Sequence, residues 1–249
     1  MSLVMWAVGF SALAGVTAAL VASSFLVLPK RIQAYGVPLL VAFAVGVLLA
    51  TAFLELLPHA LKELGGAGMD AVGLWMVATL AVIFVIDKLL RWREAWAVAE
   101  ERPAGALILV SASFHKFIDG LIIAAATLTD LALGVAAAAA ILAHEIPHDL
   151  SKIAVLLDSG YRRLTTFLLN LGVSLVMIPG AVVGVWWLHL MEGARPYMLA
   201  VAAALFTYVA LAALLPELQA RTRIRDTAVQ VLVIGLGGVI IFLIHQSFH

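Results

Sequence analysis

The sequence predicts an all-α polytopic membrane protein with eight transmembrane helices, and two observations support this fold class. Of its 249 residues, 64% are hydrophobic and 12% are charged, and the mean hydropathy is +1.11. A typical soluble domain is about 25% charged and about 45–50% apolar, so this composition favours a bilayer over water as the solvent. The chain also contains eight apolar windows of transmembrane length with short connections between them.

Each predicted span is a window of about 20 predominantly apolar residues bounded by charges or turn residues. The first window has no charged region before it and no convincing cleavage site, so we expect a retained helix rather than a signal peptide. The short connections leave no room for a soluble domain, and residues 1–249 are expected to form a single eight-helix transmembrane domain. The predicted spans are 3–28, 37–58, 71–90, 104–128, 131–157, 164–190, 197–215 and 227–248.

The charged residues are sorted along the chain although their sum is zero, with 15 basic and 15 acidic side chains. Two basic residues, Lys62 and Arg195, fall on one side of the predicted bundle, and 11 fall on the other. The richer side is expected to be cytoplasmic, which places both termini outside the cell membrane, or outside the inner membrane if the source is bacterial. The 11 residues are Lys30, Arg31, Lys88, Arg91, Arg93, Arg102, Arg162, Arg163, Arg221, Arg223 and Arg225.

The composition also excludes several classes of function. A net charge of zero gives no reason to expect nucleic acid as a partner. The absence of cysteine excludes disulfide frameworks, thiolate metal sites and cysteine nucleophiles. A lipid bilayer is the expected surrounding, and a homodimer is a candidate assembly that the sequence does not test.

A short sequence repeat relates the second span to the seventh. Leu56-Leu57-Pro58-His59 ends the former, and Leu214-Leu215-Pro216-Glu217 ends the latter. In the predicted topology one lies near the outer face and the other near the inner face. This is the relation expected of inverted repeats made of spans 1–3 and 6–8, although Leu-Leu-Pro can also recur by chance in a leucine-rich protein.

Ionisable residues are concentrated in the middle of spans 4 and 5. A charge at the centre of a membrane helix costs at least about 2.5–3.5 kcal/mol, so such residues usually face a cavity or one another. His115 and Asp119 share one helix face, as do His144 and His148, because each pair is four residues apart. An interhelical hydrogen bond is a sufficient explanation for a lone histidine near a span end, such as His245, but not for this cluster.

These side chains predict a divalent-metal site. His115, Asp119, His144 and His148 are the expected ligands because four nitrogen and oxygen donors suit Zn²⁺, and Glu145 belongs to the same candidate site. Pro147 has no N–H, so we expect span 5 to bend there and to free a carbonyl beside the site.

Together these residues resemble the signatures of the ZIP (ZRT/IRT-like) family of divalent-metal transporters. Residues 115–120 and 144–150 resemble the fourth- and fifth-helix motifs, the latter being closest to the branch that usually reads H-E-I-P-H-E-L-G-D. Residues 54–58 and 208–217 are similar to the second and seventh helices, so the resemblance covers nearly the whole chain. It implies eight helices, outward termini, zinc-type transport and a metal site halfway across the membrane that is often binuclear in the family.

The departures from the family pattern carry further expectations. Lys116 stands where the family usually has asparagine, and an ammonium cannot bind a metal while protonated. We therefore expect Lys116 to replace a second metal as a fixed cation that pairs with Glu145 and Asp119. Lys152 follows Ser151 where Gly-Asp is common, and it is expected to counter charge on the inner exit path.

Three acceptors near span ends are candidates for the transport path. Glu55 takes a position where the family frequently has histidine, and with His59 it is expected to guide ions toward the site from outside. Glu217 is expected to act near the inner end. An interfacial polar residue without such a role explains each of them about equally well.

The sequence thus predicts a transporter rather than an enzyme, with Zn²⁺ moving toward the cytoplasm as cargo and no cofactor. Cd²⁺, Fe²⁺, Co²⁺ and Mn²⁺ remain alternative cargoes because affinity follows a general series. The alternative function is an intramembrane zinc metalloprotease, since residues 144–148 satisfy H-E-x-x-H. Against it, Asp119 precedes that motif, whereas such proteases carry their third ligand downstream, and His115 fills the position that a catalytic zinc keeps open.

Overall fold

A computed structural model of the chain describes residues 2–25, 27–65, 68–99, 104–219 and 224–248. Within these ranges helices are joined by short connections and no strand occurs. Eight of the described helices are long and apolar enough to cross a membrane. The predicted all-α polytopic fold class is therefore confirmed.

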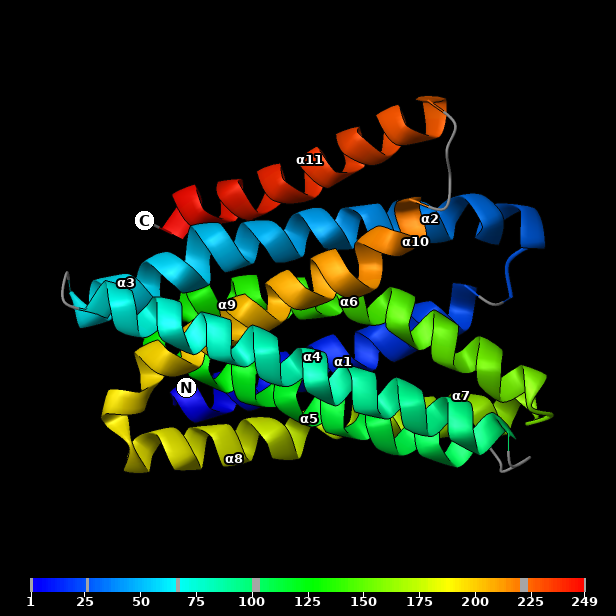
Figure 1. The fold of residues 1–249 in the computed structure, drawn as a ribbon, viewed down its shortest axis with the longest axis horizontal. Coiled ribbons are helices and arrows are strands. Elements are labelled where there is room, and N and C mark those ends of the chain that lie inside the picture. Colours follow the sequence, from blue (N-terminus) through cyan, green and yellow to red (C-terminus); the bar gives the residue numbers. More distant parts are fainter. Residues whose placement is uncertain (1, 26, 66–67, 100–103, 220–223, 249) are drawn as a thin grey trace.

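The eight spans lie side by side as a bundle of near-parallel rods (Figure 1). Three of them are assembled from more than one helical segment, and two of these contain a π-helix, labelled η1 and η4. In chain order the spans are α1 (Leu3–Phe25); α2 (Lys30–Ala50), η1 (Thr51–Leu56) and α3 (Leu57–Leu64); α4 (Met69–Ala99); α5 (Ala104–Thr129); α6 (Leu131–Asp158); α7 (Arg163–Ser174) and α8 (Met177–Leu190); α9 (Arg195–Tyr208), η4 (Val209–Leu214) and α10 (Leu215–Gln219); and α11 (Ile224–Phe248).

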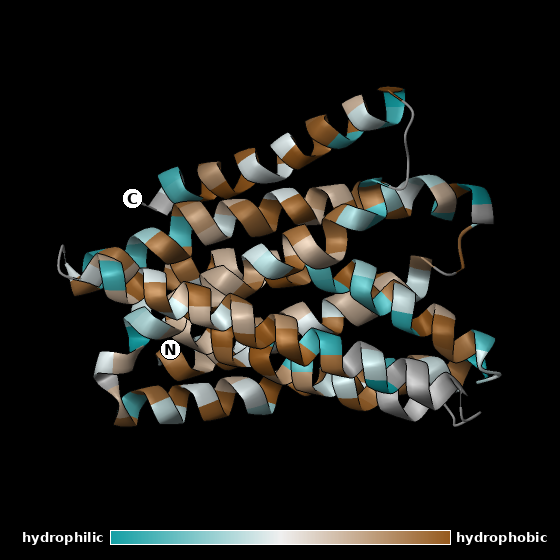
Figure 2. Cartoon of the chain, viewed as in Figure 1, coloured by the Kyte–Doolittle hydropathy of each residue, from teal (hydrophilic) through white to brown (hydrophobic). Residues whose placement is uncertain are grey.

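The helix α6 lies in the interior of the bundle, and α4 and α11 lie at its periphery. Of the apolar stretch of α6, 56% is buried, against 6% for α4 and 17% for α11. The interior helix packs against α1, α2 and α5, whereas α11 packs mainly on α2 and α4 mainly on α9. Hydrophobic residues predominate along the rods (Figure 2), and large apolar side chains are exposed on α4, α8 and α11, as expected for a protein whose solvent is lipid.

The two ends of the bundle differ in what they carry. Both termini lie at one end, which we call the terminal end (Figure 1). The connection from α6 to α7, where α7 begins at Arg163, lies at the other, which we call the basic end. The chain enters α5 at the basic end and leaves α6 there. Among the basic residues assigned to this side from the sequence, Arg102, Arg221 and Arg223 lie outside the described residues.

Several predicted boundaries differ from the structure, since α2 begins at Lys30 rather than at 37 and α4 continues to Ala99 rather than to 90. The second span continues to Leu64 rather than 58, because η1 accommodates Pro58 without ending the helix. The sixth span is not continuous, since it breaks between Ser174 and Met177. Pro179 explains the break, because its ring clashes with the carbonyl four residues earlier and it has no N–H to donate.

The two π-helices occupy equivalent places in the second and seventh spans. Each has six residues, ends on the first leucine of a Leu-Leu-Pro sequence, and is closed by an N–H that donates to a carbonyl five residues back. The wider turn moves the carbonyl that the proline ring would otherwise meet. Because α2 and α9 run in opposite directions, η1 lies toward the terminal end and η4 toward the basic end (Figure 1).

Glycine contacts hold α5 against α8. A Cβ added to Gly120 would lie 2.7 Å from the backbone nitrogen of Ala181 and would overlap the Met177 carbonyl. A Cβ on Gly180 would in turn overlap the carbonyl of Phe117. This close approach places the polar face of α5 opposite α6.

Candidate metal centre

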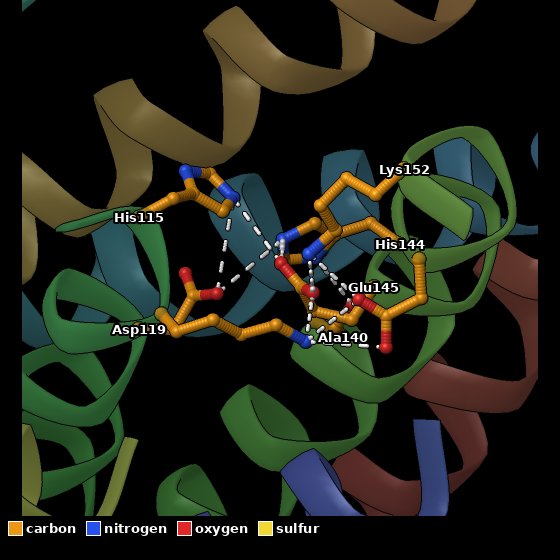
Figure 3. Close-up of polar contacts among 8 residues, drawn as sticks. His115, Asp119, Ala140, His144, Glu145 and Lys152 are labelled. Atoms are coloured by element: carbon orange, nitrogen blue, oxygen red, sulfur yellow. Dashed lines mark hydrogen bonds and ion pairs between the residues drawn. The ribbon is translucent and has the colours of Figure 1, made fainter. Parts of the chain in front are cut away.

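Four side chains from α5 and α6 converge inside the bundle, and Figure 3 shows them pointing toward one another. His115 and Asp119 come from α5, and His144 and Glu145 come from α6. One ligand atom from each of these residues lies within 4.8 Å of the other three. Asp119, His144 and Glu145 are at most 2% exposed, so the cluster lies in the interior of the bundle.

The distances within this cluster fit a tetrahedral site that is slightly expanded. Ligands at 2.0–2.2 Å from a tetrahedral Zn²⁺ are about 3.3–3.6 Å apart. The Oε1 atom of Glu145 lies 3.3 Å from Nε2 of His115 and 3.6 Å from Nε2 of His144. The Oδ2 atom of Asp119 lies 3.8 Å and 3.9 Å from the same two nitrogens. None of these four atoms has a hydrogen-bond partner in the described structure.

The orientation of His144 suits a metal ligand. Its Nδ1 atom lies 3.0 Å from the carbonyl oxygen of Ala140, one turn earlier in α6. A hydrogen bond from Nδ1–H to that carbonyl leaves the lone pair on Nε2, which faces the cluster. Metal-binding histidines are commonly held in this way, with the second nitrogen bound to a carbonyl or carboxylate.

His148 lies beside the four-residue cluster rather than within it. Its ring centroid is 5.4 Å from that of His115 and 6.0 Å from that of His144. Its Nε2 atom is buried and has no hydrogen-bond partner in the described structure. The residue pattern suggested His148 as the fourth ligand beside His115, Asp119 and His144. In the structure, Glu145 is the fourth member of the closest cluster instead.

A network of ion pairs adjoins the cluster on the same two helices. Lys116 is fully buried, contacts Oε2 of Glu145, and lies 3.2 Å from Oδ1 of Asp149. Lys152 lies 2.7 Å from the same Asp149 oxygen and 3.9 Å from Oε2 of Glu145. Lys116 therefore pairs with Glu145 as expected, but its second partner is Asp149 rather than Asp119. The Asp119 carboxylate turns instead toward His115 and His144.

A cavity of about 280 Å³ extends from the cluster toward the basic end. Its walls are α4, α5, α6, α9 and η4, and the lining includes His115, His148 and Lys152. Farther along, the Tyr208 hydroxyl donates a 3.1 Å hydrogen bond to Oδ2 of Asp87 in the wall. On the opposite side of the cluster, fully buried apolar residues fill the bundle, including Ile123, Leu133 and Leu199.

The other candidate path residues lie apart from the cluster. Glu55 is 2% exposed in η1, and its Oε1 atom lies 3.0 Å from Nδ1 of His245 in α11. The expectation of an interhelical hydrogen bond is confirmed for His245. His59 lies one turn beyond Glu55, with Nδ1 2.7 Å from its backbone carbonyl. Glu217 is exposed in α10 near the basic end.

Sequence reasoning missed Asp149 and Asp87 in these networks, and it did not identify the partner of His245. Asp149 had a signal, because it is four residues after Glu145 and three before Lys152, and so shares their face. Asp87 had none, because it contacts Tyr208 on a helix far away in the chain. The partner of His245 had none for the same reason, because Glu55 is 190 positions away.

Comparison with known proteins identifies the family to which the chain belongs. The family model described as ZIP Zinc transporter matches residues 2–101 and 93–245. Zinc transporter ZIP13 of Pongo abelii is 30% identical over 191 residues, covering 72% of this chain and 58% of that protein. Human zinc transporter ZIP4 is 36% identical over 120 residues, or 48% of this chain, and human zinc transporter ZIP6 is 33% identical over 112 residues, or 45%. The matches cover 18% of ZIP4 and 15% of ZIP6, so the chain spans much less than these relatives' full lengths. Because the family model extends over nearly all of its residues, the chain belongs to the ZIP zinc transporter family.

Proposed function

We propose that the chain transports divalent metal ions across a membrane, with Zn²⁺ as the main cargo, through the cluster of His115, Asp119, His144 and Glu145. The observation that carries this proposal is the set of four buried donors without hydrogen-bond partners, at distances close to those of a tetrahedral metal site. His148 faces the same cavity and completes the donor set when the ion moves toward the basic end. Imidazole and carboxylate donors also accept Fe²⁺, Co²⁺, Mn²⁺ and Cd²⁺, so competition among ions measures the selectivity.

The cavity and the charge distribution support transport toward the basic end. If the basic end is cytoplasmic, as the positive-inside rule expects, the cavity leads from the cluster into the cell and the state described is inward-facing. The ion then leaves His115 for the cavity, where water replaces the protein ligands. Lys152 lines this route and neutralises the Asp149 carboxylate beside it, so the exit retains less negative charge to hold the departing ion.

Charge balance supports a single bound ion. Asp119, Glu145 and Asp149 contribute three negative charges, and Lys116 and Lys152 contribute two positive ones when all are ionised. The cluster therefore carries one negative charge without cargo and one positive charge with a single divalent ion. A second ion would raise this to three positive charges in a low-dielectric interior, where unbalanced charge is costly. Lys116 takes the place of the second metal.

The entry route is proposed to pass Glu55 and His59. The Glu55 carboxylate is nearly fully buried on the terminal-end side and is held by His245. A carboxylate and imidazoles at this position offer an entering cation exchangeable donors. Glu217 is a candidate for a corresponding role near the basic end.

The proposed setting is the cell membrane, or the inner membrane of a bacterium, with both termini outside. Residues 1–249 act as a single transmembrane domain in this proposal. A homodimer is a candidate assembly, which cross-linking in the membrane would detect.

Metal uptake into reconstituted vesicles tests the function. We expect saturable Zn²⁺ uptake that is lost in His115→Ala and His148→Ala, because both side chains face the cluster or its exit. His189→Ala is the matched control, since His189 is exposed near the terminal end, and it should retain uptake. Equal uptake by all three variants would contradict the proposal.

In the metalloprotease alternative, Glu145 would act as a general base rather than as a metal ligand. A general base must reach a metal-bound water, but one oxygen of Glu145 contacts Lys116 and the other faces His115 and His144. The four close donors also leave no open coordination position for catalysis. Peptide cleavage that depends on Glu145, without net ion flux, would favour the protease.

A further inference from the structure

Five polar atoms buried between α1 and α7 have no hydrogen-bond partner among the described residues. They are the hydroxyl oxygens of Ser11 and Ser23 in α1 and of Thr166 and Ser174 in α7, together with the Nδ2 atom of Asn170 in α7. All of these residues except Ser23 are at most 2% exposed. We call the five residues the polar seam, and they belong neither to the metal centre nor to the lining of its cavity.

The missing partners are unusual for this protein. A serine or threonine within a helix can satisfy its hydroxyl by donating to a backbone carbonyl one turn earlier. Eight hydroxyls of the described residues do so, including that of Thr127, which is fully buried and donates to the Ile123 carbonyl at 2.7 Å. The seam hydroxyls are not satisfied in this way, so their partners have to come from outside their own helices.

The packing of the two helices arranges the seam residues in one line. The helices α1 and α7 run in opposite directions, since α1 begins at the terminal end and α7 at the basic end (Figure 1). A Cβ added to Gly15 would lie 2.6 Å from the carbonyl oxygen of Ser174, so these two residues are level. Ser23 and Thr166 are level for the same reason, because each lies eight positions from that contact, toward the basic end. Asn170 lies between Thr166 and Ser174 on the same face of α7.

The inner end of the seam coincides with the break between α7 and α8. There the Ile178 N–H donates to the Leu175 carbonyl at 3.0 Å, instead of to the Ser174 carbonyl as in a continuous helix. The Ser174 carbonyl therefore lacks its regular donor, and it faces Gly15 of α1. Ser11 precedes Gly15 by one turn, which places it level with the break. Both hydroxyls and a carbonyl oxygen thus meet at this depth.

The seam reaches the depth of the metal centre without sharing its cavity. A Cβ on Gly120, the residue after Asp119, would overlap the carbonyl of Met177. The sulfur of Met177 in turn lies 3.1 Å from the position of a Cβ on Gly15. The cavity is lined by α4, α5, α6, α9 and η4, whereas the seam lies between α1 and α7. The two polar regions are therefore separate.

Water is the occupant that fits the seam. A buried polar group without a hydrogen bond costs free energy, and several at one interface would offset a large part of the stability of a fold. Buried water removes this cost, because each molecule makes about three hydrogen bonds to such groups. A cation does not fit, because the Nδ2 atom of Asn170 carries two N–H donors that would repel it.

We propose that the polar seam binds a file of water molecules, which extends from the basic end, where α7 begins, to the helix break at Ser174. The file is a second hydrated route into the bundle, separate from the cavity of the metal centre. Its role rests on the proposed transport function: it hydrates the interior at the depth where the ion exchanges protein ligands for water. The binding of water itself does not depend on that function.

Hydroxyl-radical footprinting of the full chain in lipid nanodiscs tests this proposal, with Met177 as a native reporter. Met177 is fully buried, and radicals made by X-ray radiolysis of water oxidise a buried thioether only where water reaches it. Leu188→Met is the matched control, because Leu188 is fully buried in the same span but lies among apolar residues.

We expect Met177 to be oxidised at least about tenfold faster than the thioether introduced by Leu188→Met, because an apolar site stays dry. Ser174→Ala and Thr166→Val each remove one seam hydroxyl and should lower Met177 oxidation several-fold, without changing oxidation of the exposed Met191. Thr127→Val should leave Met177 oxidation unchanged, because that hydroxyl already has a partner. Equal oxidation of Met177 and the Leu188→Met thioether would overturn the inference, as would Met177 oxidation that neither seam variant lowers.

Two further measurements separate this inference from a cation site and from the proposed function. An unfolding midpoint that rises with Na⁺ but not with choline, and no longer does so in Ser174→Ala, would show a cation site and overturn the assignment to water. Zn²⁺ uptake is measured on the same protein in vesicles. The expected footprint without uptake would refute transport and support the seam, whereas uptake with unoxidised Met177 would refute the seam alone.

Discussion

Replacing Lys116 with asparagine tests how many metal ions the centre holds. The substitution removes a fully buried ammonium and leaves Glu145 and Asp149 with Lys152 as their remaining cationic partner among the described residues. The amide oxygen of asparagine can bind a metal, which the ammonium cannot. We therefore expect the variant to bind two divalent ions per chain, where the unsubstituted protein binds one.

The cost of this change without metal can be worked from the geometry. The Lys116–Asp149 pair at 3.2 Å has an attraction of about 5 kcal/mol at an effective dielectric constant of about 20. Removing one partner of a buried ion pair typically lowers the free energy of unfolding by about 3–5 kcal/mol, which is close to this attraction. For a chain of this size, that loss lowers the unfolding midpoint by roughly 6–20 °C.

A second metal ion should restore much of this stability. Binding at a concentration 100 times the Kd adds about 2.7 kcal/mol to the folded state. We expect the unfolding midpoint of Lys116→Asn in detergent to rise steeply with added Zn²⁺, and more than that of the unsubstituted chain. Elemental analysis of the purified protein gives the number of ions directly.

Lys152→Asn is the control for this experiment. It removes the same charge from the same network, but Lys152 is 12% exposed and lines the cavity, so solvent compensates for part of the change. This variant should keep one ion per chain. One ion in Lys116→Asn as well, with no added dependence on Zn²⁺, would refute the idea that the lysine replaces a metal.

Three further predictions concern the site, the entry route and the packing. Zn²⁺ binding should weaken as pH falls from about 7.5 to about 5, because protons compete with the metal for the imidazole and carboxylate donors. An affinity that stays constant over this range in isothermal titration would contradict the proposed donor set. Glu55→Gln should lower uptake several-fold at low external Zn²⁺ and have little effect at saturation, whereas the exposed Glu63→Gln should behave like the unsubstituted chain. Gly120→Ala should destabilise the bundle by about 1–3 kcal/mol in thermal unfolding, because the added Cβ would lie 2.7 Å from the Ala181 nitrogen. Gly9→Ala is the control, because a Cβ added there meets open space. An unchanged midpoint for Gly120→Ala would argue against the packing described.

The fold class and the residues of the centre could be predicted from local pattern. Eight apolar windows predicted the eight spans, since a bilayer requires a minimum helix length regardless of how the helices pack. The spacing of His115 and Asp119 placed both on one face, because a helix brings residues four apart together. The break after Ser174 was missed, although Pro179 carried the signal.

The sequence by itself therefore determined the number of membrane helices, the sorting of basic residues and the donors grouped on two helices. Each of these depends on hydropathy or on the helical repeat, which are properties of neighbouring residues. Only the tertiary structure decided that Asp149 rather than Asp119 pairs with Lys116, that His245 holds Glu55, and that the cavity leads toward the basic end. These outcomes depend on which helix faces meet and at what depth, and such contacts join residues up to 190 positions apart, beyond the reach of any local pattern.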